Sequence, residues 1–224
     1  MFIGHAAIAL GAKKAAPKIS LGTLLMSTQF LDLLWPIFIL LGIEHVRIDP
    51  GNTAVTPLDF YDYPISHGLL TSIGWSILFG LVYYSVRKNR IGACVVGLGV
   101  FSHWLLDFVS HRPDLPIAPG INTYFGLGLW YSLPATMIVE GLMFVGGIVL
   151  YLRTTKALDR IGTYAFWGFI AFLMIVWMAN ILGPPPPTVT SLGYAGLSIW
   201  ILVAWAYWID RHRKPLETAV GEEL

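Results

Sequence analysis

Two hydrophobic stretches of this chain carry ionisable residues where a plain membrane helix would have none. Residues 20–43 contain Asp32, and residues 91–109 contain His103 and Asp107. A charged side chain at the depth of a lipid bilayer is costly, so such groups usually face a protein interior or a water-filled cavity and have polar partners. The sequence therefore predicts a polar site inside an apolar bundle.

The spacing of the ionisable residues indicates which of them share a face. His103, Asp107 and His111 follow one another at intervals of four residues, so on a helix they form one stripe. His67 opens a further apolar stretch, and Glu140 lies inside another with no basic residue beside it. Glu140 is a candidate base, proton carrier or hydrogen-bond partner of a ligand histidine. Glu140 and His111 are the candidate catalytic residues.

These residue types favour a divalent metal. Imidazole nitrogens and carboxylate oxygens suit zinc, manganese or iron, and Cys94, the only cysteine, allows no thiolate cluster and no internal disulfide. Two histidines and two carboxylates can hold one ion and leave a position for water, which the ion would activate as a nucleophile. His5 and His111 could help to bind a second ion. We expect zinc, with manganese as the alternative.

Each candidate also has a simpler structural interpretation. His5 could be an interfacial histidine, and His111 could belong to a turn at a helix end. Asp32, His103 and Asp107 could form a buried network of ion pairs or hydrogen bonds that holds the bundle together.

The composition is that of a membrane protein with a single domain. The chain has 224 residues, of which 56% are hydrophobic and 12% charged, and its mean hydropathy is +0.68. Soluble domains carry about 25% charged residues. The net charge of +1 gives no electrostatic case for binding nucleic acid. Membrane lipids are the expected surroundings.

Six apolar stretches approach the length of about 20 residues that a transmembrane helix needs. Their continuous hydrophobicity favours helices over the alternating strands of a barrel. We therefore expect an all-α integral membrane bundle of about six transmembrane helices, preceded by a short apolar N-terminal helix. This domain covers residues 1–214, and residues 215–224 form a short mobile cytoplasmic tail. The stretches are 20–43, 66–86, 91–109, 134–152, 163–182 and 193–209.

Basic residues alternate between the connecting segments. The positive-inside rule then places both termini in the cytoplasm and residues 44–65, 110–133 and 183–192 outside. Asp59 and Asp62, in the first outer segment, are expected to be solvated. The clusters assigned to the cytoplasm are Lys13, Lys14 and Lys18; Arg87, Lys88 and Arg90; Arg153, Lys156 and Arg160; and Arg211, Arg213 and Lys214.

The order of several short motifs resembles the YdjM-like family of bacterial inner-membrane proteins, described as membrane-bound metal-dependent hydrolases. The similarity covers roughly the first 135 residues. Where family members tend to show Pro-Asp-x-Asp, this chain has Gln29 in place of the first acid or its neighbour. The matching motifs are His5 with Gly11, Gln29-Phe30-Leu31-Asp32, Ser66-His67-Gly68, His103-Trp104-Leu105-Leu106-Asp107 and the stretch Gly126 to Trp130.

The resemblance implies a metal site and a hydrolytic activity. Its metal ligands would be His5, Asp32, His67, His103 and Asp107. We expect metal-assisted hydrolysis of an amphiphilic, lipid-like ester or phosphoester that enters from the membrane. The alternatives are a proton-coupled permease that uses the same residues as a relay, and a non-catalytic membrane protein with a polar core network. His5 can reach the site only if residues 1–12 re-enter between the helices.

Overall fold

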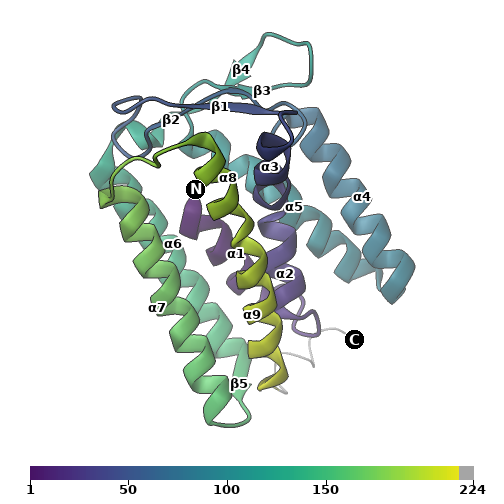
Figure 1. Ribbon diagram of the computed structural model, residues 1–224. Helices are drawn as coiled ribbons and strands as arrows, with labels where there is room; N and C mark the ends of the chain where they lie inside the picture. The colour runs from purple at the N-terminus through teal and green to yellow at the C-terminus, as the bar shows by residue number, and fades with distance from the viewer. Residues whose placement is uncertain (217–224) are drawn as a thin grey trace.

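Long apolar helices make up most of the chain in the computed structural model, which describes residues 1–216 (Figure 1). The helices are α1 (Phe2–Ala15), α2 (Leu21–Thr28), α3 (Phe30–Leu40), α4 (Leu69–Arg87), α5 (Arg90–Ser110), α6 (Leu133–Thr154), α7 (Arg160–Leu182), α8 (Val189–Leu197) and α9 (Ile199–Arg211), with a 3₁₀ turn at Leu129–Tyr131. The strands are β1 (His45–Ile48), β2 (Leu58–Asp62), β3 (Leu115–Pro116), β4 (Tyr124–Phe125), β5 (Thr155–Ala157) and β6 (Arg213–Pro215).

The predicted membrane-spanning character of the helices is confirmed in its coarse form. Helices α4, α5, α6 and α7, and the unit formed by α8 and α9, are long and apolar enough to cross a membrane. Helices α2 and α3 make a sixth candidate span, bent by 56° at its break. The six expected stretches therefore correspond to five straight candidates and one bent one.

The bend between α2 and α3 lies at Gln29, which caps both helices with non-helical backbone angles. The hydroxyls of Ser27 and Thr28 donate to the carbonyls of Leu24 and Leu25 at 2.7 and 3.3 Å. Hydroxyls bonded back to the preceding turn tend to bend helices. The last carbonyls of α2 lose their intrahelical partners at the break and become available to other donors.

Helix α1 begins in the interior of the bundle. It packs against α6, α2 and α5, and Met1 at its start is only 3% exposed. Its 14 residues rise about 21 Å, less than the hydrocarbon thickness of about 30 Å. Helix α6 approaches α1 backbone to backbone, since a Cβ at Gly147 would lie 2.6 Å from the carbonyl oxygen of Ala7. This is the re-entry that His5 requires.

A buried ion pair ties the other end of α1 to α9. Lys13 is 3% exposed, and its Nζ donates to Ile19 O at 2.6 Å and to Asp210 Oδ2 at 3.1 Å. The same Asp210 oxygen accepts the Leu21 N–H at 2.6 Å, which begins α2. The turn between α1 and α2 is therefore fixed against the end of α9.

Short pairs of antiparallel strands lie at the two ends of the bundle. Strands β1 with β2 and β3 with β4 lie at one end, and β5 lies at the other (Figure 1), where it pairs with β6. Strand β6 includes Pro215, and Leu216 N donates to Thr154 O at 2.7 Å. The expected mobile tail therefore starts within a hydrogen-bonded strand, and the rest of it, residues 217–224, lies outside the described residues.

Labelling of introduced cysteines tests whether the helices cross a membrane. Asn122, between β3 and β4, and Lys156 in β5 are both exposed and lie at opposite ends of the bundle. The exposed Cys94 is first replaced by Ala. In intact cells, a membrane-impermeant maleimide should label Asn122→Cys or Lys156→Cys but not both, and permeabilised cells should show both. Labelling of both in intact cells would contradict a spanning bundle.

Candidate metal centre

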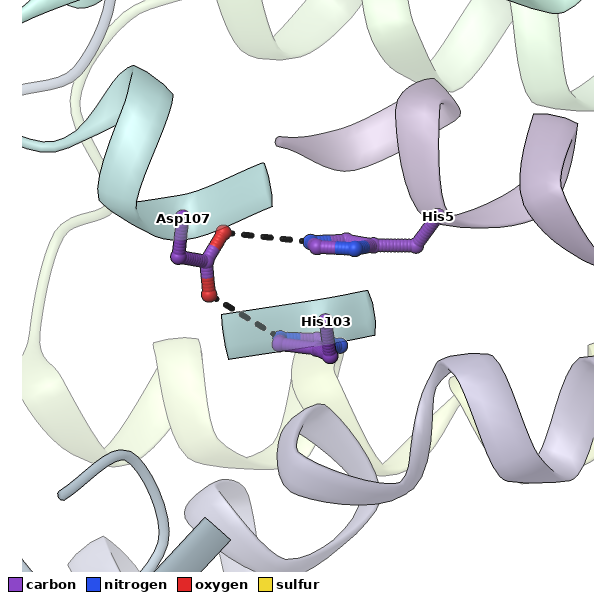
Figure 2. A group of neighbouring side chains, drawn as sticks. All are labelled: His5, His103 and Asp107. Carbon is purple, nitrogen blue, oxygen red and sulfur yellow. Dashed lines mark ion pairs between the residues drawn. The ribbon is translucent and has the colours of Figure 1, made fainter. Parts of the chain in front are cut away.

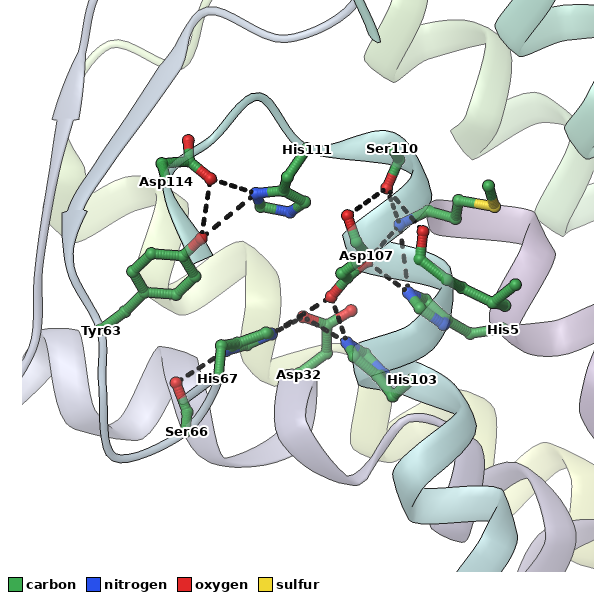
Figure 3. Close-up of polar contacts among 12 residues, drawn as sticks. His5, Asp32, Tyr63, Ser66, His67, His103, Asp107, Ser110, His111 and Asp114 are labelled. Carbon is green, nitrogen blue, oxygen red and sulfur yellow. Dashed lines mark hydrogen bonds and ion pairs between the residues drawn. The ribbon is translucent and has the colours of Figure 1, made fainter. Parts of the chain in front are cut away.

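The predicted ligands come together where α1, α3, α5 and the segment before α4 meet (Figure 3). His5 comes from α1, Asp32 from α3, His67 from the turn before α4, and His103 and Asp107 from α5. Four of them are almost completely buried, whereas the Asp32 side chain is 28% exposed. Asp32 is therefore the member of the group that solvent or a substrate can reach.

Four donor atoms surround one small space. His67 Nε2 lies 3.5 Å from Asp32 Oδ1 and 3.7 Å from Asp107 Oδ2. His103 Nε2 lies 3.6 Å from the same Asp32 oxygen and 3.1 Å from the same Asp107 oxygen. Nitrogen and oxygen ligands of a tetrahedral zinc ion are about 3.3–3.6 Å apart, given metal–ligand bonds of about 2.0–2.2 Å. The donor atoms of Asp32, His67 and His103 all lie within 4.8 Å of one another, and Asp107 Oδ2 lies beside both histidines, so these four residues could hold a single ion.

The hydrogen bond on the far side of His103 fixes its tautomer. His103 Nδ1 lies 2.8 Å from the carbonyl oxygen of Thr28, which can only accept, so Nδ1 carries the proton. In the neutral ring His103 Nε2 then holds a lone pair, and it makes no hydrogen bond within residues 1–216. In the protonated ring the same nitrogen is the ion-pair partner of Asp107 Oδ2 at 3.1 Å. A buried lone pair facing two carboxylates is unfavourable unless a cation lies between them. The donor set therefore fits a metal ion.

A second group of potential ligands adjoins the first through Asp107. His5, His103 and Asp107 have donor atoms within 4.8 Å of one another. Figure 2 shows Asp107 reaching both histidines, whose rings are stacked at 3.6 Å between centroids. Asp107 Oδ1 lies 3.2 Å from His5 Nε2 and 2.6 Å from the amino nitrogen of Met1. The two oxygens of Asp107 thus face different sets of nitrogens, as in a carboxylate that bridges two cations.

Glu140 accepts a hydrogen bond from the backbone at the start of α1. The carboxylate Oε2 accepts the Ile3 N–H at 3.1 Å, and Glu140 is 1% exposed. The first N–H groups of a helix have no intrahelical partner, and inside an apolar bundle no water replaces it. Glu140 therefore holds the beginning of α1 in place, and with it His5. It does not belong to either group of potential metal ligands.

His111 lies outside the metal-ligand groups, although it shares a stripe with His103 and Asp107 in the sequence. Helix α5 ends at Ser110, and His111 Nδ1 lies 2.9 Å from Asp114 Oδ1 and 3.3 Å from the hydroxyl of Tyr63 (Figure 3). Tyr63 donates to the same Asp114 oxygen at 2.9 Å. Burial and the Asp114 carboxylate raise the pKa of the Tyr63 phenol well above its usual value, so the phenol remains a donor.

The two acids of strand β2 differ from each other. Asp62 is 44% exposed, as expected for a solvated acid, and its carboxylate lies 2.8 Å from His45 Nδ1. The same expectation is wrong for Asp59, which is 6% exposed and paired with Arg47 and Arg112. These two arginines come from β1 and from the turn after α5, so the hairpin and the end of α5 share one buried charge.

Two groups behind the candidate ligand histidines were not predicted from the sequence. One is the carbonyl of Thr28, which is free only because the first span is broken. The other is Glu44, which is 1% exposed and bonds to Ser66 beside His67. Glu44 stands at the end of an apolar stretch next to His45, and a charged residue in such a position is typically interfacial. The Ser66-His67 motif marks His67 in the sequence, but it does not show that Glu44 bonds to Ser66.

No protein-family model matches this chain, and neither the curated proteins nor the solved structures include a match to it. The resemblance to the YdjM-like family therefore stays a prediction from the motifs.

Replacement of Glu140 tests its role at the start of α1. Glu140→Ala removes a charged acceptor from a buried N–H, which should cost about 2 kcal/mol and lower the melting temperature in detergent by roughly 4–8 °C. Glu140→Gln should cost less, because the amide oxygen still accepts the Ile3 N–H. Asp62→Ala is the control, since that acid is solvated. An unchanged melting temperature for Glu140→Ala would show that this contact does not hold α1.

Proposed function

We propose that this protein is a membrane-embedded, metal-dependent hydrolase that acts on an amphiphilic ester or phosphoester. The observation that carries the proposal is the convergence of His67 Nε2 and His103 Nε2 on the Asp32 and Asp107 carboxylates, while His103 Nε2 makes no hydrogen bond among the described residues. A polar network that only holds helices together would place donors against acceptors. This arrangement favours a cation over such a network.

Zinc is the proposed ion, with manganese as the alternative, because the donor set is imidazole and carboxylate. A divalent ion held by these residues supplies Lewis acidity that polarises a carbonyl or phosphoryl oxygen and activates water at neutral pH. The chain's own part is to hold the donors in place and to take up a proton. We assign the proton to Asp32 Oδ2, because Asp32 is the exposed member of the group and its Oδ1 faces both histidines.

The surroundings of the site favour an amphiphilic substrate. Leu105 lies between the two α5 ligands His103 and Asp107 in sequence, and it is 46% exposed. One face of α5 therefore bounds the polar site while another presents apolar surface, separated by one helix diameter of about 10 Å. A lipid-like molecule can place its polar group at the site and its chain along such a surface.

The proposal includes an orientation in the bacterial inner membrane. The turns between α1 and α2 and between α4 and α5 line one pocket together at the end opposite β1–β4. These turns carry basic residues, which the positive-inside rule places in the cytoplasm. The hairpins β1–β2 and β3–β4 and the metal centre beneath them then face outward. Labelling of Asn122→Cys in intact cells is the expected result.

Metal analysis of purified variants tests the centre. Wild-type protein purified with added zinc or manganese should retain about one ion per four-ligand set. His103→Ala and Asp107→Ala should each weaken zinc binding by at least about 10–100-fold, since even the loss of a residue behind a ligand costs that much. His45→Ala is the control, because His45 is exposed on β1. This variant should bind as much metal as wild type.

Hydrolysis is measured on the same preparations with a panel of lipid esters and phosphoesters. Turnover should appear in wild type and His45→Ala, disappear with a chelator, and return with zinc or manganese. Metal-replete wild type that holds no ion would sink the proposal, and so would metal bound equally by His103→Ala and Asp107→Ala. Bound metal without turnover on any member of the panel would argue against the hydrolase.

A further inference from the structure

A chain of hydrogen bonds runs from Glu44 to His67, behind the metal centre. Glu44 lies between α3 and β1, and its Oε1 accepts the N–H groups of Ile65 and Ser66, each at 2.7 Å. Its Oε2 lies 2.5 Å from Ser66 Oγ, and Ser66 Oγ lies 2.7 Å from His67 Nδ1 (Figure 3 shows the Ser66–His67 part). Glu44, Ser66 and His67 are all at least 95% buried.

The direction of each hydrogen bond in this chain follows from the inventory of donors. A carboxylate only accepts, so the single hydroxyl proton of Ser66 is given to Glu44 Oε2. Ser66 Oγ can then only accept from the imidazole, which places a proton on His67 Nδ1. In the neutral ring His67 Nε2 is left with a lone pair, and it faces Asp32 Oδ1 and Asp107 Oδ2 at 3.5 and 3.7 Å.

We propose that Glu44 is a positioning residue of the metal centre, which acts through Ser66 to hold the His67 ring in the tautomer that presents Nε2 to the ion. This inference rests on the proposed metal site. Metal-binding histidines commonly donate their second ring N–H to an acceptor that fixes tautomer and orientation. For His103 that acceptor is the carbonyl of Thr28, and for His67 it is a hydroxyl whose own proton is committed to Glu44.

Glu44 also connects the helix that carries Asp32 with the turn that carries His67. It follows α3, which carries Asp32, and it binds the backbone of the turn that carries His67. The relative position of Asp32 and His67 therefore depends on a contact outside both side chains. If Glu44 only held the turn that carries His67, its bonds to the two backbone N–H groups on Oε1 would be enough. The additional bond from the Ser66 hydroxyl to Oε2 is the one that controls the tautomer of His67.

The sharpest test is Glu44→Gln, which preserves shape and reverses the chain. With its oxygen on the Ile65 and Ser66 N–H groups, the glutamine NH₂ must donate to Ser66 Oγ. The Ser66 hydroxyl then donates to His67 Nδ1, and the proton on the ring moves to Nε2. Ser66→Ala breaks the chain but leaves the backbone bonds to Glu44 intact. Thr71→Ala is the matched control, because Thr71 Oγ1 donates within the same turn, to Pro64 O at 2.7 Å, and has no bond to His67.

The first readout is the tautomer in metal-free protein, by ¹⁵N NMR of imidazole-labelled histidine in detergent, with the His67 signals identified from His67→Asn. Wild type and Thr71→Ala should carry the proton on Nδ1, Glu44→Gln on Nε2, and Ser66→Ala should show both forms. The second readout is zinc affinity by chelator competition, which should fall by about 10–100-fold in Glu44→Gln and Ser66→Ala only. Melting temperatures monitor folding.

The outcomes separate the two proposals. An Nδ1 proton in all variants overturns the role of Glu44, and the metal centre then stands or falls by zinc binding in wild type alone. A wild type that binds no zinc overturns the proposed function, while the tautomer comparison still decides whether Glu44 controls His67. Equal zinc affinity in wild type and Glu44→Gln overturns the positioning role even when the tautomer shifts.

Discussion

A helix that begins inside an apolar bundle leaves its first peptide N–H groups without water, and each unpaired group in an apolar medium costs free energy. Helix α1 meets this constraint with Glu140 of α6, whose carboxylate accepts the N–H of Ile3. His5 lies within the same first turns of α1, so its ring reaches His103 and Asp107 only while that contact holds. A glutamate outside the ligand groups thus helps to hold one of the histidines at the centre.

The centre forms where regular helices are interrupted. Helix α1 starts at the site, the first span breaks at Gln29 beside it, and α5 ends soon after Asp107. Interrupted backbone is tolerated at membrane depth only where protein or a cavity shields it. Here the interruption is used, because the break frees the carbonyl of Thr28 to bond His103 Nδ1. Both histidines of the four-donor set therefore have their tautomers determined by groups behind them.

The parts of the fold and site that depend on local spacing could be predicted from the sequence. The apolar stretches match the observed helices, and the pairing of His103 with Asp107 follows from one helical turn. His111 shares that spacing but lies past the end of α5, where the stripe no longer applies. The partner of Glu140 could not be predicted, because it depends on how α1 docks. Glu44 was missed for the same reason, since its bonds reach across 22 residues to Ser66.

The contact between Glu140 and α1 also sets an order of assembly. Helix α1 is synthesised before α6, but the acid that accepts its opening N–H group belongs to α6, which follows α2 to α5 in the chain. Until then a stable place for the start of α1 within lipid is missing, because nothing in hydrocarbon can accept that N–H. Helix α1 therefore reaches its native position only after α6 has been made, and the candidate metal centre is completed only when most of the bundle has formed.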